Sequence, residues 1–463
     1  MKYLFTTAAL LLFGTAQAQN QVDIKQNGTD NAHTVQQTGT DEKLTLIQGT
    51  AKESSTGASA TVTTGGMLNE VFIRQVGVNQ RVNVEQGTSG GSAVGNEFSI
   101  RQGGTGNDAT TVQGADNGTA RSNTTTLKQL EGANNIGSIL QGVSHGLAEN
   151  NTATLNQSGD SNTANITQGS SEDGYNGTAQ NNIGTLTQRG DGNDATITQG
   201  VSFGGTLDGI AKDNAATLRQ TGNDNEASIS QGVNGLAEGN RATLTQVGDD
   251  NWAVIVHGGY SSTSRANTAS LTQSGDENRA VVSQADFADG TAVGNTTTLT
   301  QKGNQNVAFT SQGEFDATAQ DNTATVAQTG GKNSVSVRQG WQLGIAVNNT
   351  ITLAQSGNDN EADIYQGYIG SADDNAATLT QKGDNNEAEI NQGVGRSFVR
   401  DADGNVISVT PADTHAFRSE ATISQQGDGH YAATIQAGTN NVTDLQQRGT
   451  ENFSIVLQGV SLP

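Results

Sequence analysis

The chain contains no cysteine, only 2 prolines and few aromatic residues (4%), and its 46 acidic residues outnumber its 23 basic ones. The absence of cysteine excludes disulfide bonds and thiol chemistry. Hydrophobic residues make up only 32% of the 463 residues, and this composition with a net charge of −23 is typical of disordered chains. The acidic balance also argues against nucleic-acid binding, because phosphate backbones attract basic surfaces.

An apolar run stands at the beginning of the chain. Lys2 precedes the mostly apolar stretch from Tyr3 to Phe13, and the sequence Ala16-Gln17-Ala18 has the small-x-small form of a cleavage site. This arrangement predicts a secretory signal peptide at residues 1–18, because the apolar run is too short to span a membrane. We expect the mature chain to begin at Gln19 and to be secreted.

What the chain does contain is an internal repeat, most clearly seen between residues 240 and 257. The pattern Asn-x-Ala-x-apolar-x-Gln occurs twice there, separated by four residues with turn chemistry. A spacing of two places the four repeated side chains on one face of a β-strand. These positions are Asn240, Ala242, Leu244 and Gln246, then Asn251, Ala253, Ile255 and His257, where His replaces Gln.

The half-unit recurs along almost the whole chain. We count 31 copies, of which 30 end in Gln and 27 begin with Asn. The sequence therefore predicts a single all-β solenoid over residues 19–460, built from about 15.5 strand–arc–strand repeats. A second clear copy has ladder positions at Asn375, Leu379, Gln381, Asn386, Ile390 and Gln392.

Repeated Gln and Asn side chains inside an apolar alternation require a partner, because a buried amide without a hydrogen bond is costly. Stacking each repeat on the next in register places Gln on Gln and Asn on Asn, so their amides form hydrogen-bonded ladders. The expected fold is therefore two facing, parallel, in-register sheets of the cross-β, amyloid-like kind.

The arcs between strands carry glycine at a fixed place, two residues after the Gln of the first strand. A sharp reversal needs a positive φ angle, which glycine adopts cheaply. Longer segments at about 49–68, 200–213 and 393–418 are predicted to be loop insertions on one edge. Representative arc glycines are Gly248, Gly275, Gly303, Gly357 and Gly383.

The sequence shows no catalytic, metal or cofactor site. The five His residues are scattered, and the acidic residues in the arcs lack the nonapeptide and EF-hand calcium signatures. We interpret the arc acids as solubility charges that oppose aggregation, with weak calcium binding as the alternative.

Neither end of the repeat shows a polar capping segment, which monomeric solenoids require. Uncapped strands template the addition of another chain, and complementary ends that do not close produce a filament. The predicted polymerisation positions are Asn20, Ile24, Gln26, Asn31 and Gln37 at one end and Asn441, Gln447, Asn452, Val456 and Gln458 at the other.

The unit from Leu379 to Gln392, apolar-x-Gln-x-Gly-x-x-Asn-x-Ala-x-apolar-x-Gln, resembles the curlin repeat. The whole chain is similar to an enlarged major curlin, the subunit of bacterial curli. The resemblance implies an extracellular functional amyloid of the biofilm matrix with a role in surface adhesion. It also implies a dedicated outer-membrane secretion pore, a periplasmic chaperone and a minor-curlin nucleator as partners.

Two other functions remain open at this stage. Thr residues flank the core Leu on the outer face, for example Thr243 and Thr245, and a flat array of two such columns on a solenoid could order water and bind ice. Thr is also a common solvent-facing strand residue. A monomeric adhesin is the second alternative, and it would need caps at both ends.

Overall fold

The computed structural model describes residues 20–49, 54–171, 177–202, 208–287, 289–393, 397–400, 406–411 and 414–461. The predicted signal peptide lies outside these residues. The chain divides into two compact units, residues 1–209 and 210–463. All regular elements of the described residues are β-strands, so none of these residues form a helix that could cross a membrane. Each unit is a stack of parallel strands, which confirms the predicted all-β solenoid.

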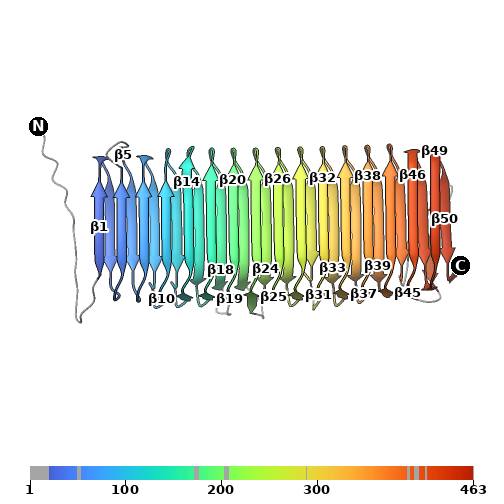
Figure 1. Ribbon diagram of the computed structural model, residues 1–463, viewed down its shortest axis with the longest axis horizontal. Helices are drawn as coiled ribbons and strands as arrows, with labels where there is room; N and C mark the ends of the chain where they lie inside the picture. The colour runs from blue at the N-terminus through green and yellow to red at the C-terminus, as the bar shows by residue number, and fades with distance from the viewer. Residues whose placement is uncertain are drawn as a thin grey trace, which may run out of the picture. The chain divides into compact units, whose positions relative to one another are not determined.

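In unit 1, every turn contributes one long strand to each of two parallel sheets, and Figure 1 shows these strands side by side. The first sheet contains β1 (Gln21–Gln26), β4 (Lys43–Gln48), β7 (Glu70–Gln75), β11 (Glu97–Gln102), β14 (Thr124–Glu131), β17 (Thr152–Ser158) and β20 (Ile183–Arg189). The second sheet contains β3 (Ala32–Gln37), β6 (Ser59–Thr64), β9 (Arg81–Gln86), β12 (Asp108–Gln113), β15 (Ile136–Val143), β18 (Thr163–Ser171) and β21 (Asp194–Ser202).

Unit 2 repeats this arrangement. Its first sheet contains β23 (Ala215–Thr221), β26 (Arg241–Val247), β29 (Thr268–Ser274), β32 (Thr296–Lys302), β35 (Thr323–Thr329), β38 (Thr350–Ser356), β41 (Ala376–Lys382), β46 (Glu420–Asp428) and β49 (Val442–Thr450). Its second sheet contains β24 (Glu226–Val233), β27 (Trp252–Gly259), β30 (Arg279–Gln284), β33 (Val307–Glu314), β36 (Ser334–Trp341), β39 (Glu361–Tyr368), β42 (Glu387–Gln392), β47 (Tyr431–Gln436) and β50 (Phe453–Gln458).

The register is the one that the repeat predicts. In the first sheet of unit 2, Leu244 pairs with Leu271 and Gln246 with Gln273. Burial alternates along each strand, and the core Leu244 and Ile255 are fully buried. The period-two pattern thus places the apolar residues and the amides between the two long sheets, while the intervening residues face outward.

The second arc differs from the expected loop, because it contains a short strand that belongs to a third parallel sheet. In most turns its central residue is a buried Ala that lies three residues before the Asn of the next strand. Ser264 takes this position in β28 and Gly438 takes it in β48, and Ala416 of β45 precedes Ser419 instead of an Asn. In unit 1 these strands are β10 (Ser92–Val94), β13 (Thr119–Arg121), β16 (Leu147–Glu149) and β19 (Gly177–Gln180). Beyond unit 1 they are β22 (Gly209–Lys212), β25 (Leu236–Glu238), β28 (Thr263–Arg265), β31 (Thr291–Val293), β34 (Thr318–Gln320), β37 (Ile345–Val347), β40 (Ser371–Asp373), β45 (His415–Phe417) and β48 (Gly438–Thr439).

The predicted loop insertion at residues 49–68 is wrong. This segment contains β6, which pairs in register with β3 on one side and β9 on the other. The repeat pattern does not identify this half-unit, because Ala58 and Thr64 replace its Asn and Gln. The added residues lie in the first arc instead, which also carries β5 (Ser55–Thr56), paired with β2 (Gly28–Thr29) and β8 (Gly77–Val78).

The other two insertions lie in the second arc. Around residues 200–213, β21 extends to Ser202 and β22 begins at Gly209. The segment at 393–418 is more than a loop, because β43 (Ser397–Arg400) and β44 (Val406–Pro411) pair as an antiparallel hairpin. β44 also pairs with β51 (Val460–Ser461), which follows the last long strand.

The arc glycines have the expected positive φ angles, and they also lie against the next turn. Gly248 has φ +117°, and a Cβ atom there would lie 2.2 Å from the carbonyl oxygen of Gly275. Gly239 has φ +65° but no such neighbour, since its closest atom would be 4.0 Å away. The first-arc position therefore requires glycine for two reasons, the backbone conformation and the close approach of turns.

We expect Gly248→Ala to lower the free energy of unfolding by clearly more than Gly239→Ala. Both variants strain a positive φ angle, at a cost of roughly 1 kcal/mol or more. The strain is greater at Gly248 (φ +117°) than at Gly239 (φ +65°), and only Gly248→Ala also forces the next turn away. Thermal unfolding followed by circular dichroism measures both. Equal losses in the two variants would show that the close approach of turns contributes nothing.

Candidate functional site

The Gln side chains of the first sheet form a continuous hydrogen-bonded ladder within each unit. In unit 2, the Nε2 atom of Gln246 donates to Oε1 of Gln273 at 2.9 Å, and Gln273 donates to Gln301 at 2.9 Å. Gln246 Nε2 also donates to the carbonyl oxygen of Glu226 in the facing sheet at 3.0 Å. Each amide therefore links two turns and also the two sheets of the solenoid.

The Asn ladders connect the sheets at the start of each strand. The backbone N–H and the Nδ2 atom of Asn349 both donate to Oδ1 of Asn322, at 2.9 and 3.0 Å. Nδ2 of Asn349 also donates to the carbonyl oxygen of Ala372, at the centre of the third-sheet strand one turn later, at 2.8 Å. One Asn side chain thus joins three successive turns and closes the corner between the third and first sheets.

The ladder positions proposed from the sequence occupy these corners and the core. Asn375 donates to Asn349, and Asn386 donates to Asn360. Gln381 donates to Gln425, and Gln392 donates to Gln436, across the hairpin insertion. The side chains that are buried are Asn240, Ala242, Leu244, Gln246, Asn251, Ala253, Ile255, His257, Asn375, Leu379, Gln381, Asn386, Ile390 and Gln392.

Two substitutions interrupt the Gln ladder of the second sheet. At Thr64 the side chain is too short, and Nε2 of Gln37 and Oε1 of Gln86 are buried without a hydrogen-bond partner. At His257 the ring Nδ1 accepts a hydrogen bond from Nε2 of Gln231 at 3.3 Å. Nε2 of His257 and Oε1 of Gln284 have no partner within hydrogen-bonding distance. Both interruptions leave unsatisfied buried polar atoms, which cost stability.

The first turn leaves one side of each long sheet open. Among the described residues, β1 pairs only with β4 and β3 pairs only with β6. The Nε2 atom of Gln26 donates to Gln48 Oε1 at 2.6 Å, so its own Oε1 faces away from the ladder. The predicted end positions are partly exposed here, whereas the equivalent positions one turn later are buried; they are Asn20, Ile24, Gln26, Asn31 and Gln37.

The last turn offers the complementary groups. The outer edges of β49 and β50 have no strand partner among the described residues. Gln425 Nε2 donates to Gln447 Oε1 at 3.0 Å, so the free direction of the Gln447 amide is its N–H side. Asn441, Asn452, Val456 and Gln458 are partly exposed, and Gln447 is 4% exposed. One end thus presents an amide acceptor and the other an amide donor.

The space around Gly449 shows that the last turn is uncovered. A Cβ atom at the equivalent Gly383 or Gly427 would overlap the carbonyl oxygen of the next turn, but at Gly449 no atom of the described residues lies within 4 Å. A further turn of the solenoid would therefore occupy the space next to Gly449.

An aromatic and acidic column lies in the second arc of unit 2. Tyr260, Phe287 and Phe315 stack at centroid distances of 5.8 and 5.5 Å, and Trp341 and Tyr368 continue the column. Asp286 and Glu314 directly precede Phe287 and Phe315, and they occupy equivalent positions in adjacent turns. Burial and the Glu314 carboxylate raise the pKa of Asp286 to about 7, and burial raises the pKa of Glu314. The repeat pattern in the sequence did not predict this column. The signal that could have indicated it is an acidic residue two positions after the ladder Gln, as at Asp286 and Glu314.

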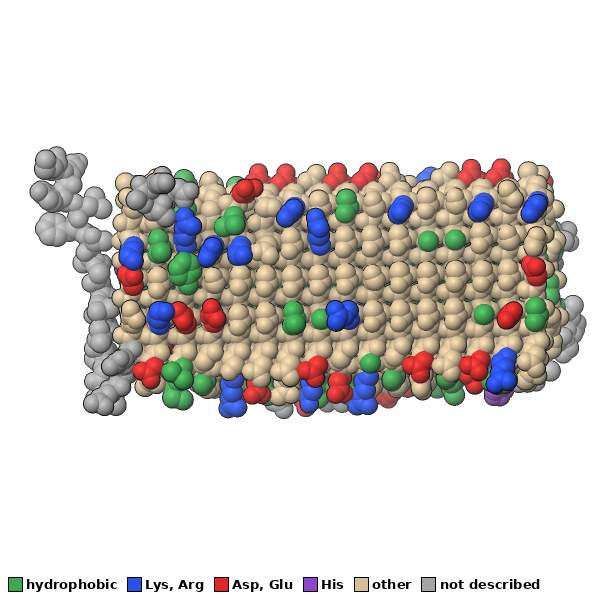
Figure 2. Space-filling model, in the orientation of Figure 1, with side chains coloured by type: hydrophobic (Ala, Val, Ile, Leu, Met, Phe, Trp, Pro, Cys, Tyr) green, Lys and Arg blue, Asp and Glu red, His purple; other side chains and the backbone are tan. Residues whose placement is uncertain are grey.

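Within the residues that the structure describes, no three His, Asp or Glu side chains lie close enough together to hold a metal ion. The face seen in Figure 2 carries mainly uncharged side chains with scattered Lys, Arg, Asp and Glu. The geometry therefore supports stacking and surface contact as its chemistry.

Residues 372–397 match the family model described as curlin associated repeat. The match begins within β40 and covers β41 and β42, including Leu379 to Gln392, from which the resemblance was drawn. It confirms the resemblance over this unit of the repeat. No curated protein matches the chain.

We expect His257→Gln to stabilise the protein, because a Gln joins Gln231 to Gln284 and satisfies two buried atoms. Burial lowers the pKa of His257 to about 4, whereas an unfolded His takes up a proton near pH 6.5. The His257 protein therefore loses stability as the pH falls below about 6.5. Thermal unfolding should show a larger gain for the variant near pH 5 than near pH 8. His145→Gln, at an exposed arc residue, is the control and should change nothing.

We expect Asp286→Asn to stabilise the protein only at neutral and alkaline pH. The raised pKa means that the stability contributed by the neutral carboxyl is present below about pH 4 and is lost as the pH rises through about 7. The variant should therefore match the parent near pH 4 and unfold at a higher temperature near pH 8. The exposed Asp289→Asn serves as control, and a pH-independent difference would contradict the role of the Asp286 charge.

Proposed function

We propose that this curlin-repeat protein is the structural subunit of an extracellular, curli-like amyloid fibre, which grows as terminal turns of successive copies stack head to tail. The observation that carries the proposal is the pair of open ends. The first turn offers the Gln26 amide oxygen and two strand edges, and the last turn offers the Gln447 N–H group and two more edges. Unpaired edges of this kind template strand addition.

The proposal includes secretion, a place in the biofilm matrix and a role in surface adhesion. The curlin repeat supports these features, since the repeat occurs in extracellular structural proteins. A secretion pore, a periplasmic chaperone and a minor-curlin nucleator are the partners that such a subunit would use. The proposed role is structural and requires no cofactor or catalytic residue.

A monomeric solenoid acting as an adhesin or ice-binding module is the second candidate. The observation that favours it is the antiparallel pairing of β44 with β51 at the last turn. This pairing leaves the outer edges of β49 and β50 without a strand among the described residues, so it does not close the stack. Thermal hysteresis in a soluble monomer would favour the ice-binding form of this alternative.

The test is assembly of the purified mature chain after dilution from denaturant, followed by thioflavin fluorescence and electron microscopy. We expect filaments whose fibre diffraction shows reflections near about 4.7 and 10 Å, the spacings of strands and stacked sheets. Gly449→Ala should slow elongation at least tenfold, because its Cβ atom would occupy the place of the incoming turn. The monomer should still fold, with a loss of roughly 1 kcal/mol from the strained φ angle of +101°, since no atom of the described residues lies within 4 Å of that position.

Gly239→Ala is the matched control, because it strains a positive φ angle without approaching another turn, and it should elongate at the parental rate. A soluble monomer that persists for days would contradict the proposal. Equal elongation of Gly449→Ala and the parent would contradict growth at the last turn.

A further inference from the structure

The first turn carries a histidine in its interior. His33 stands in β3 at a position where most other turns have Ala, and it pairs in register with Ala60 of β6. Its Nδ1 atom lies 3.0 Å from Nε2 of Gln26 in the facing strand β1. The ring is partly exposed, since β3 has a strand partner on one side only among the described residues.

The direction of the Gln26 amide is fixed by the next turn. Nε2 of Gln48 donates to the carbonyl oxygen of Ala32 at 3.1 Å, and a carbonyl oxygen can only accept. The Gln48 amide therefore turns its Oε1 toward Gln26, whose Nε2 donates to it at 2.6 Å. Because Nε2 carries both donor hydrogens of Gln26, Nδ1 of His33 is the acceptor of the second bond. The His33 ring is therefore neutral, with its proton on Nε2.

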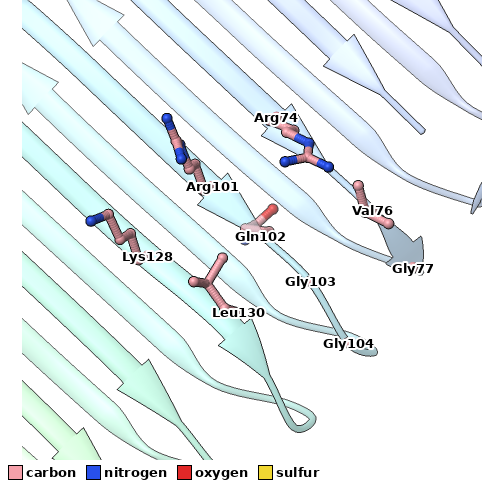
Figure 3. Close-up of a pocket in the computed structure, with 9 residues that line it drawn as sticks. All are labelled: Arg74, Val76, Gly77, Arg101, Gln102, Gly103, Gly104, Lys128 and Leu130. Carbon is pink, nitrogen blue, oxygen red and sulfur yellow. The ribbon is translucent and has the colours of Figure 1, made fainter. Parts of the chain in front are cut away.

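Most ladder Gln residues of the first sheet use their second N–H hydrogen in another way. Gln102 Nε2 donates to Oε1 of Gln129 at 2.9 Å and to the carbonyl oxygen of Arg81 at 2.9 Å. Figure 3 shows Gln102 at the end of β11, just before the arc glycine Gly103. Arg81 is the first residue of β9, the second-sheet strand of the preceding turn. An interior Gln is thus held by a backbone carbonyl of the turn before it.

Gln26 has no such carbonyl among the described residues, because no strand of the second sheet precedes β3 there. His33 takes the place of that carbonyl and keeps the second N–H of Gln26 directed toward the facing sheet. When two copies stack, the equivalent carbonyl is that of Phe453, the first residue of β50 in the preceding copy. The same register places Ser454 beside His33.

Charged side chains do not face the His33 ring from the strands that pack against it in the described part of the chain. β3, β6 and β50 contain no charged residue. Glu42 is buried at the second-arc end of the turn, where it accepts from Asn69, whereas His33 lies at the first-arc end. The charged residues of β1, β4, β49 and the first arcs stand at outward-facing or exposed positions; they are Asp23, Lys25, Asp30, Lys43, Asp444, Arg448 and Glu451.

Protonation of His33 would remove the acceptor that Gln26 uses. Histidine is the side chain whose charge normally changes between pH 5 and 8. The Gln26 amide would then lose this bond or turn its oxygen toward the ring. A turned amide sets its oxygen against Oε1 of Gln48 and its N–H group against the N–H group of an incoming Gln447. A joined copy would also enclose a charged ring without a counter-ion, which is unfavourable.

We propose that His33 is a positioning residue of the joint between copies, and that its neutral ring holds the Gln26 amide ready for the last turn of a second copy. The proposal rests on the proposed function, because it concerns growth of the fibre at the same ends. Joining transfers the second N–H of Gln26 from His33 to the carbonyl of Phe453. Ser454, where most turns have Ala, supplies a hydroxyl group beside the released Nδ1 atom. Protonation of His33 slows elongation.

The test measures seeded elongation of the mature chain at pH 5 and pH 8 from the loss of soluble protein, with seeds and monomer of the same chain. His33→Asn keeps a side-chain acceptor but cannot take up a proton. We expect it to elongate within about twofold of the parent at pH 8 and at least fivefold faster than the parent at pH 5. Comparing two chains at one pH cancels the effect of the 46 acidic residues, which both chains share.

His33→Ala separates the positioning of Gln26 from the charge of the ring. It removes the acceptor at every pH, so it should elongate at least threefold more slowly than His33→Asn at both pH values. His145→Asn, at an exposed arc residue, is the control and should follow the parent at both. Circular dichroism of each soluble chain checks that the variants fold.

The outcomes distinguish this proposal from the fibre proposal. If the ratio of His33→Asn to parent is the same at pH 5 and pH 8, the role of the His33 charge is wrong. Equal elongation of His33→Asn and His33→Ala would overturn the positioning role. Either result leaves the fibre proposal intact, whereas absence of filaments in the parent at both pH values would overturn both proposals.

Discussion

The hydrogen bond between the side-chain amides of successive turns is the interaction on which the rest of this structure depends. A Gln or Asn buried among Ala, Leu and Ile would normally be destabilising, since its polar atoms lose water. Here each amide finds its partner in its own copy one turn away, as Gln246 does in Gln273. The polar residues of the core are therefore stabilising only while the stack continues.

This dependence explains the other constraints in the chain. Register must be exact to one residue, because a slip would place Gln against an apolar neighbour and reverse the faces of the strand. The arcs must let turns approach to the spacing of strands, and glycine at positions such as Gly248 allows it. Thr64 and His257 show the cost of a departure, because each leaves buried amide atoms of its neighbours without partners.

Much of the fold could be predicted from the sequence, because each repeat in the sequence corresponds to one turn of the solenoid. The period-two spacing indicated the buried faces, and the conserved spacing of Gln and Asn within this one chain indicated the register. The strand at Ser59–Thr64 was missed because the search relied on Gln and Asn, while Val62 and its alternation still carried the pattern. The third sheet was missed because a single buried Ala per turn is a weak signal, although in most turns it lies three residues before the next Asn. The hairpin of β43 and β44 occurs once, so no repeat could reveal its pairing.

The direction of the Gln ladders has a consequence for the physical character of the stack. Within each unit every printed Gln-to-Gln bond donates from the earlier turn to the later one, as in Gln75 to Gln102 and Gln301 to Gln328. The amide dipoles therefore add along the axis instead of cancelling, much as peptide dipoles add along an α-helix. A stack of this kind is electrically polar, with two inequivalent ends, and a field applied along it would exert a torque that grows with the number of turns.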